Sequence, residues 1–160
     1  MAYQFRFQKL LELKENEKDQ SLSEYQQSVS EFENVAEKLY ENMSKKELLE
    51  QNKEKKLKSG MSVQEMRHYQ QFVSNLENTI YHYQKLVIMK RNQMNQKQEI
   101  LTEKNIEVKK FEKMREKQFK MFALEDKAAE MKEMDDISIK QFMIQGHRSE
   151  CNVRQKERIR

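Results

Sequence analysis

Three histidines, one cysteine and many carboxylates are the side chains of this chain that could carry chemistry. His68 and His82 are two heptads apart, not at the i, i+4 spacing of helical metal ligands, and His147 lies at an expected helix end. Cys151 has no fixed histidine or helix N-terminus to activate it. The carboxylates fall on solvated faces, and two glycines are too few for a phosphate-binding loop. We therefore expect no catalytic residue, no metal site, no cofactor and no enzymatic activity.

The elements that carry these side chains follow from the near absence of proline and glycine. The chain of 160 residues has no proline and only two glycines, Gly60 and Gly146. Charged residues and apolar residues each make up 36% of it, and good helix formers dominate. Such a composition can bury a narrow seam but not a wide core. The sequence predicts an all-α fold, an antiparallel coiled-coil hairpin with a longer second helix, as one elongated unit.

The charge and the remaining composition limit the location and the partners. The net charge is +4, and residues 148–160 contribute +3 of it, so the basic pI does not indicate a nucleic-acid-binding rod. A single cysteine fits a reducing compartment. No apolar run approaches the roughly 20 residues of a membrane span, and the N-terminus lacks the basic-then-apolar layout expected of a signal peptide. We expect a cytoplasmic protein with no nucleic-acid partner, whose residues 148–160 form a disordered basic tail.

Apolar residues recur at alternating steps of three and four along both expected helices, which is typical of a coiled coil. The first helix is expected over residues 3–58 and the second over residues 63–145, about 80 Å and about 125 Å long. The first seam comprises Leu22, Tyr25, Val29, Phe32, Ala36, Leu39 and Met43. The second comprises Met66, Tyr69, Val73, Leu76, Ile80, Tyr83, Val87, Lys90, Met94, Lys97, Leu101, Lys104, Val108 and Phe111. The three seam lysines either extend their ammonium groups to solvent or set the register.

Local signals place the turn at residues 59–62. Gly60 can supply a left-handed cap for the first helix. Ser62 and Glu65 form a capping box at the start of the second, in which each side chain bonds the other's backbone N–H. Met61 and Met66 stand at the staple positions on either side. Because the connection is short, the helices are expected to run antiparallel.

The second helix is long enough to overshoot the start of the first, from about Gln118 onward. Its apolar residues there would lack a partner within the chain, and such a helix usually expects one from elsewhere. These residues are Phe119, Met121, Phe122, Leu124, Met131, Met134, Ile137, Ile139, Phe142, Met143 and Ile144.

Two further features have alternative interpretations. Phe72 lies beside the second seam, with Tyr69, Gln70 and Gln71 next to it, and it is either an interface anchor or part of a slightly wider seam. At the N-terminus, Tyr3, Phe5 and Phe7 alternate with the period of a strand. Residues 5–7 are therefore either a frayed helix start or a docking segment.

These two features together resemble one protein family. The opening Phe5-Arg6-Phe7-Gln8-Lys9-Leu10-Leu11-Glu12-Leu13-Lys14, with its Phe-x-Phe-x-x-Leu-Leu pattern, resembles the start of the flagellar FliJ proteins. The second match is Tyr69-Gln70-Gln71-Phe72, early in the second helix, with Leu76 following. The resemblance covers residues 1 to about 147 and looks like a Bacillus-type member.

The resemblance implies a stalk in the flagellar type III export apparatus, at the cytoplasmic side of the cell membrane. Its partners would be the hexameric export ATPase, the cytoplasmic domain of the membrane export gate, and export chaperones. The implied gate-binding residues are Tyr69, Gln70, Gln71, Phe72, Leu76, Thr79 and Tyr83, of which Thr79 and Tyr83 depart from the usual family residues. On the first helix the matching positions, Lys38, Asn42 and Lys45, are not carried over. The implied ring-binding residues are Phe5, Arg6, Phe7, Leu10, Leu11, Phe119 and Phe122.

Two other interpretations remain open beside the stalk. The exposed methionines favour an adaptor or chaperone coiled coil that binds export substrates. The regular heptads are equally consistent with a structural coiled coil that associates with itself. For the stalk we expect a protein that is monomeric when free.

Overall fold

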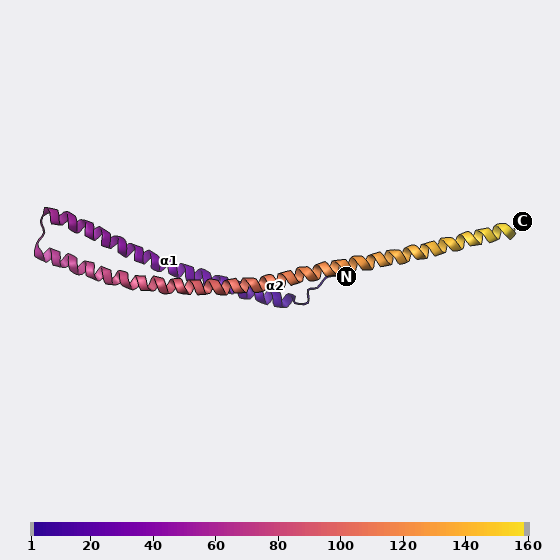
Figure 1. Cartoon of the computed structure of the whole chain (residues 1–160), viewed down its shortest axis with the longest axis horizontal. Coiled ribbons are helices and arrows are strands. Elements are labelled where there is room, and N and C mark those ends of the chain that lie inside the picture. The colour runs from indigo at the N-terminus through magenta and orange to yellow at the C-terminus, as the bar shows by residue number, and fades with distance from the viewer. Residues whose placement is uncertain (1, 159–160) are drawn as a thin grey trace. The chain divides into compact units, whose positions relative to one another are not determined.

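Two helices form almost all of the computed structural model, which describes residues 2–158. Helix α1 is Gln8–Ser59, with 52 residues, and helix α2 is Val63–Arg158, with 96 residues (Figure 1). No strand occurs between residues 2 and 158. The predicted all-α fold with a longer second helix is confirmed. The contacts divide the chain into two units, residues 9–109 and residues 2–8 with 110–158.

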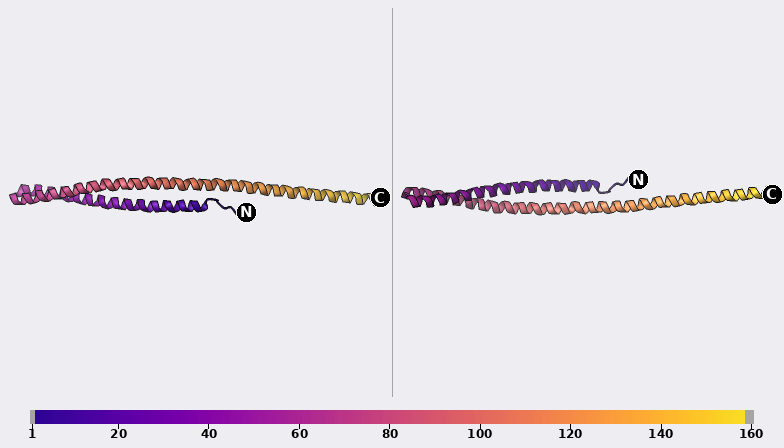
Figure 2. Two further views of the ribbon diagram at one scale, coloured as in Figure 1. Left: turned by 90° about the horizontal axis from the view of Figure 1, so that it is seen from below. Right: turned by 90° about the horizontal axis from the view of Figure 1, so that it is seen from above.

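Within residues 9–109, α1 and α2 lie side by side in opposite directions (Figures 1 and 2). Glu17 pairs with Lys104, and Glu31 pairs with Lys90, so the residue number falls along α2 as it rises along α1. The antiparallel hairpin predicted from the short connection is therefore confirmed.

The turn is built by the residues that the sequence indicated. Gly60 has a φ of 96°, in the left-handed region that glycine reaches without a Cβ clash. The Ser62 N–H donates to Glu65 Oε2 at 3.4 Å, and the Glu65 N–H donates to Ser62 Oγ at 3.3 Å. The capping box is thus formed in both directions, and it satisfies donors that α2 would otherwise leave unpaired at its first turn.

The seam predicted on α2 is the one that the structure buries. From Tyr69 to Phe111 every predicted position is buried or half-buried, with Ile80 and Val108 the most enclosed, and only Met66 at the turn is exposed. The three lysines of the series are half-buried like their apolar neighbours. The helix therefore keeps its 3–4 spacing through the polar positions.

The seam predicted on α1 is partly wrong. Leu22 and Met43 are exposed. Ser21 and Ser28, one residue before the predicted positions Leu22 and Val29, are buried instead. The buried series starts at Leu11, which is fully buried, and its 3–4 steps lead to these serines and not to the more apolar neighbours. Covalent spacing along the helix outweighs the hydrophobicity of one side chain, because a one-residue shift would turn the whole series away from α2.

Both outer helix boundaries also differ from the prediction. Helix α1 begins at Gln8 and not at Tyr3, because residues 2–7 form a non-helical segment that ends where the Gln8 N–H donates to the Phe5 carbonyl at 3.2 Å. Helix α2 continues to Arg158 and not to residue 145, so residues 148–158 are helical and not disordered. Gly146 has no positive φ and does not cap the helix, and the residues after it are mostly tolerated in helices. Residues 159–160 lie outside the described residues.

Within the described residues, neither helix has a stretch that is both long and apolar enough to span a bilayer.

Candidate interaction surfaces

A ladder of ion pairs fixes how α1 and α2 are aligned. The Nζ atoms of Lys90, Lys97 and Lys104 lie 2.8, 2.8 and 3.2 Å from carboxylate oxygens of Glu31, Glu24 and Glu17, respectively. Neighbouring pairs are seven residues apart on both helices, so a slip by one residue would break all of them together. Of the two interpretations of the seam lysines, the geometry therefore favours the setting of register.

The ladder shifts the pKa of its carboxyl groups. Hydrogen bonds from the Lys97 and Lys90 ammonium groups lower the pKa of Glu24 and Glu31, and that of Glu17 is lowered by Lys104 and then by Lys14. Lys14 itself lies 3.1 Å from Glu107 across the seam, and the hydrogen bond raises the pKa of its ammonium group. Sequence reasoning missed the glutamates, although their heptad spacing matches that of the seam lysines.

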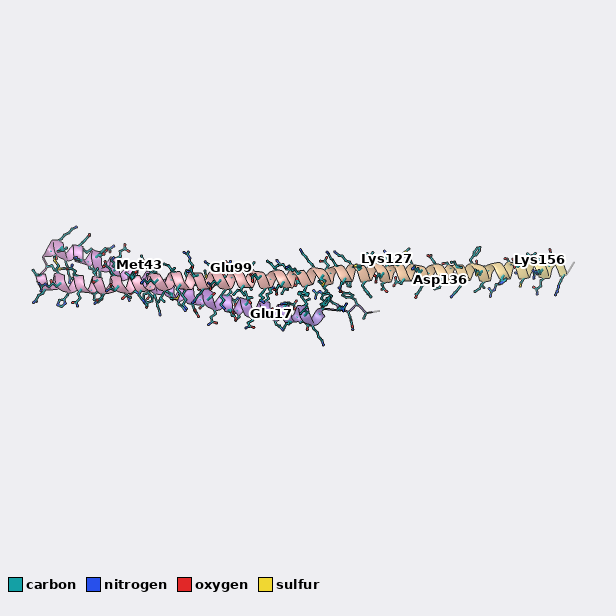
Figure 3. The ribbon with its side chains drawn as sticks, turned by 60° about the horizontal axis from the view of Figure 1, so that its bottom comes forward. Glu17, Met43, Glu99, Lys127, Asp136 and Lys156 are labelled. Atoms are coloured by element: carbon teal, nitrogen blue, oxygen red, sulfur yellow. The ribbon has the colours of Figure 1, made fainter. Side chains whose placement is uncertain are left out.

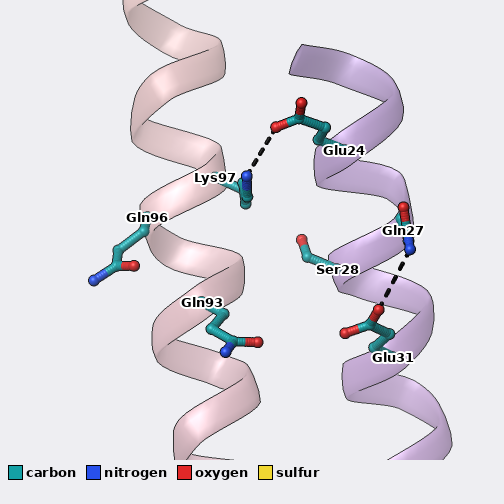
Figure 4. Close-up of a pocket in the computed structure, with 7 residues that line it drawn as sticks. All are labelled: Glu24, Gln27, Ser28, Glu31, Gln93, Gln96 and Lys97. Carbon is teal, nitrogen blue, oxygen red and sulfur yellow. Dashed lines mark hydrogen bonds and ion pairs between the residues drawn. The ribbon is translucent and has the colours of Figure 1, made fainter. Parts of the chain in front are cut away.

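A polar groove of about 370 Å³ follows the ladder between the two helices (Figure 4). Ser28 points toward the facing helix, and its hydroxyl donates to the Tyr25 carbonyl at 2.6 Å. Glutamine and charged side chains complete the lining: Glu24, Gln27, Glu31, Gln93, Gln96 and Lys97. The groove lies where the seam position of α1 is occupied by Ser28, whose side chain is too small to fill the space between the helices.

The predicted gate-binding residues form a patch close to the turn with one strongly exposed aromatic ring. Phe72 is 56% exposed, so of its two interpretations the wider seam is excluded. Tyr69 is half-buried, and the Lys56 Nζ lies 5.3 Å from its ring centroid. Leu76 and Tyr83 are half-buried at the seam beside it. Gln70, Gln71 and Thr79 are exposed.

The predicted ring-binding residues near the N-terminus have unequal access to solvent. Phe5 is 8% exposed and Leu11 is fully buried, so both are already covered within the chain. Arg6 and Leu10 are exposed, and Phe7 is half-buried with its ring 6.0 Å from that of Phe5. The prediction that these residues contact a ring is not tested by the burial of their side chains.

Phe119 and Phe122 were predicted to have no partner within the chain, and this is wrong. The Tyr3 ring centroid lies 5.2 Å from that of Phe119 and 5.4 Å from that of Phe122. The Tyr3 hydroxyl also donates to the main-chain carbonyl of Arg115 at 3.1 Å. Sequence reasoning placed Tyr3 inside the first helix and so missed that a non-helical segment could bring its ring back onto α2.

Residues 118–158 of α2, which we call the extension, become fully exposed after Phe122. Every described residue from 123 onward is exposed, and Figure 3 shows Lys127, Asp136 and Lys156 on this part of α2. The exposed set includes large apolar residues throughout. Beyond Phe122, the prediction of an unpartnered apolar helix is therefore confirmed.

The chemically active side chains do not gather in the structure. Among residues 2–158, no group of three His, Cys, Asp or Glu side chains has a geometry that could hold a metal ion. Cys151 is exposed near the end of α2. His147 lies 3.8 Å from Glu150 on the helix surface, where both are exposed.

The sequence was compared with known protein families, proteins and structures. The model of the family described as "Flagellar FliJ protein" matches residues 3–147. The chain belongs to the FliJ family. It is also 99% identical over 147 residues to the "Flagellar FliJ protein" of Bacillus subtilis (strain 168). The aligned residues make up 92% of this chain and 100% of that relative. No solved structure matches. The resemblance noted from the two FliJ-like motifs is thereby confirmed, and the chain is a flagellar protein. Residues 148–160 lie beyond the family match.

Proposed function

We propose that this chain is a non-enzymatic stalk of the flagellar type III export apparatus. It links and activates the hexameric export ATPase and contacts the cytoplasmic domain of the membrane export gate. It also escorts export chaperones. It works in the cytoplasm, at the membrane-facing base of the flagellum, and is monomeric when free. Family membership supports the flagellar setting, and the two surfaces described above support the two contacts.

One observation carries the ring contact: the apolar residues of the extension lie on every side of the helix. At about 100° per residue, positions 18 apart share a side. Phe119 and Ile137 are one such pair, and Met121 and Ile139 are another, on nearly the opposite side. Leu124 and Phe142 form a third pair, and all six side chains are more than half exposed. Exposed apolar residues on every side of a helix can be covered only by partners on every side, and a ring of subunits supplies them.

The gate contact is supported by the exposure of Phe72 beside polar amides. An aromatic anchor with a polar surround is the usual composition of an interface hot spot. Leu76 and Tyr83 continue the same side of α2 but are half-buried at the seam. We therefore expect Phe72 to contribute most to the gate contact and the seam residues to position it.

The gate contact is tested by binding of the purified cytoplasmic gate domain to wild type, Phe72→Ala and Tyr81→Ala. Tyr81 is the matched control, because it is 60% exposed and lies nine residues along α2, on the opposite side of the helix. Phe72→Ala should weaken binding roughly 30-fold, the size of a hot spot of about 2 kcal/mol. Equal effects of the two substitutions would remove the gate contact from this patch.

The ring contact is tested by the ATPase rate of the export ATPase with saturating stalk. Met121→Glu and Ile137→Glu place charges on nearly opposite sides of the extension, and Lys127→Ala is a control within the same stretch. Each glutamate variant should lower the stimulation, and the control should retain it. If only one side mattered, a single docked helix would replace the enclosing ring. A wild type that leaves the rate unchanged would contradict the stalk.

The extension also favours the second candidate function, an adaptor that binds export substrates or their chaperones. Met121, Met131, Met134 and Met143 are exposed there, and flexible thioether side chains suit partners of different shape. Truncation after Gln118 separates the two functions. If chaperone binding is lost and ATPase stimulation is retained, the result supports the adaptor function. Loss of stimulation first supports the stalk.

A self-associating spacer has less support from the structure. A second copy would need an apolar stripe, yet the stripe of α2 is already used by α1 and the extension has none. Light scattering that gave a dimer mass would restore this function. A nucleic-acid partner is not part of the proposal.

A further inference from the structure

The N-terminal segment, residues 2–7, is attached to the side of α2 that the proposed ring contact uses. Tyr3 reaches three positions of α2: the Arg115 carbonyl with its hydroxyl, and the rings of Phe119 and Phe122 with its own ring. These positions are spaced i, i+4 and i+7, so they share one side of the helix. We call Tyr3 with these three residues the aromatic clasp.

The clasp has the geometry of a specific contact. Tyr3 and Phe119 meet edge to face, with ring planes at 77°, and Phe122 is tilted at 48° to Tyr3. Edge-to-face pairs at about 5 Å are a favoured aromatic arrangement. The Arg115 carbonyl has a second lone pair for the Tyr3 hydroxyl, so the helix hydrogen bond need not be broken.

Apart from the clasp, the most enclosed residue of the segment is Phe5. Phe5 is 8% exposed, and its carbonyl accepts a hydrogen bond from the Gln8 N–H at 3.2 Å. Gln4 and Arg6 on either side are exposed, and residues 2–5 form no regular secondary structure. A short strap with one anchor can release its end while α1 stays folded, because no backbone hydrogen bond of either helix depends on Tyr3.

We propose that residues 2–7 are a releasable strap that competes with the ATPase ring for the Phe119–Phe122 side of α2. This inference rests on the proposed function, in which these two phenylalanines contact the ring. Phe119 remains 52% exposed under the clasp, so a partner can begin to bind at its free edge and then displace Tyr3. The apparent affinity for the ATPase ring equals the affinity of the open form multiplied by the fraction of molecules in which the strap is open.

The presence of the strap is tested without any partner. The chain has no tryptophan, so Tyr3→Trp introduces a single fluorescent reporter. Its indole should be protected from iodide in the free protein, and Phe119→Ala with Phe122→Ala should remove the protection. Equal quenching in both backgrounds would overturn the strap even if the ring binds.

Competition is tested by titrating the purified export ATPase into wild type, Tyr3→Ala, Tyr3→Phe and Gln4→Ala. Loss of the clasp should tighten binding roughly tenfold for Tyr3→Ala, and less for Tyr3→Phe, which keeps the ring and loses only the hydroxyl. Gln4→Ala is the matched control from the same segment and should bind like wild type. Unchanged or weaker binding by Tyr3→Ala, while wild type binds, would overturn the strap and leave the proposed function standing. If neither wild type nor any variant binds, the ring contact fails and the competition fails with it.

Discussion

The paired hairpin and the extension have similar compositions and opposite distributions of apolar residues. In residues 9–109 the apolar side chains of α2 recur every three or four residues, and α1 covers that line. In the extension, Met121 and Ile139 lie nearly opposite Phe119 and Ile137, and residues from 123 onward are exposed. The arrangement of apolar residues around a helix thus indicates from how many sides it is meant to be covered.

The seam of the hairpin shows a second difference, because it holds polar residues at positions that face a partner helix. Ser21, Ser28 and the ladder lysines occupy seam positions, and each lysine has a carboxylate partner on α1. Polar seam positions specify register at a cost in stability. In the extension no such constraint acts, since nothing in the described chain lies opposite it after Phe122.

The largest expected effect is on stability, from Leu11→Ala. Leu11 is fully buried, so its truncation should lower the free energy of unfolding by about 2–5 kcal/mol. Leu124→Ala is the matched control, because Leu124 is 69% exposed in the extension and should change it by less than about 0.5 kcal/mol. Urea unfolding followed by circular dichroism measures both. Equal losses would mean that the extension is covered in solution.

A smaller effect separates the two glycines. Gly60 has a φ of 96°, where an L residue is strained, so Gly60→Ala should lower the unfolding free energy of the hairpin by about 1–2 kcal/mol. Gly146 is helical with nothing within 4 Å of an added Cβ, so Gly146→Ala should raise the helix content by a small amount. The measurement is thermal unfolding with helix content. A stabilising Gly60→Ala would show that the turn is not left-handed in solution.

The residues that could be predicted from the sequence are those whose structure is set locally. The Gly60 turn, the Ser62–Glu65 capping box and the α2 seam depend on residues within a few positions of one another. The α1 seam could not be read as reliably, since Leu22 is more apolar than Ser21 and only the partner helix decides between them. Tyr3 was missed for a related reason, because its contacts lie more than a hundred residues away in the sequence.

The candidate sites also differ in whether their structure depends on nearby or on distant residues. The exposure of Phe72 follows from its offset by one residue from the seam, which the 3–4 spacing already contains. The contact of Phe119 with Tyr3 depends on the path of the N-terminal segment, and no short pattern encodes that path. The glutamate ladder falls between the two cases, since its heptad spacing is visible only when both helices are aligned.

The smallest expected effect is the pH dependence of the ladder, because its charges are partly solvated. The pKa of Glu17, Glu24 and Glu31 is lowered from 4.5 in the folded chain, so the unfolded chain binds more protons as the pH falls. The stabilising contribution is therefore complete well above pH 4.5, and it is lost as the pH falls through the lower folded pKa values. Replacing the three glutamates by glutamine should flatten this dependence in urea unfolding between about pH 6 and about pH 3.

An ion pair within α2 supplies the control for this measurement. Glu116 also has a lowered pKa, because the Lys120 ammonium donates to it at 2.7 Å, but the two residues belong to one helix. Protonation of Glu116 should loosen a local turn without separating α1 from α2, so Glu116→Gln should leave the pH profile of hairpin unfolding as it is. If Glu116→Gln flattened the profile as much as the ladder variant, the ion pairs would support helicity alone. If the ladder fixes the register across the seam, only the interhelical glutamates should affect the pH profile of hairpin unfolding.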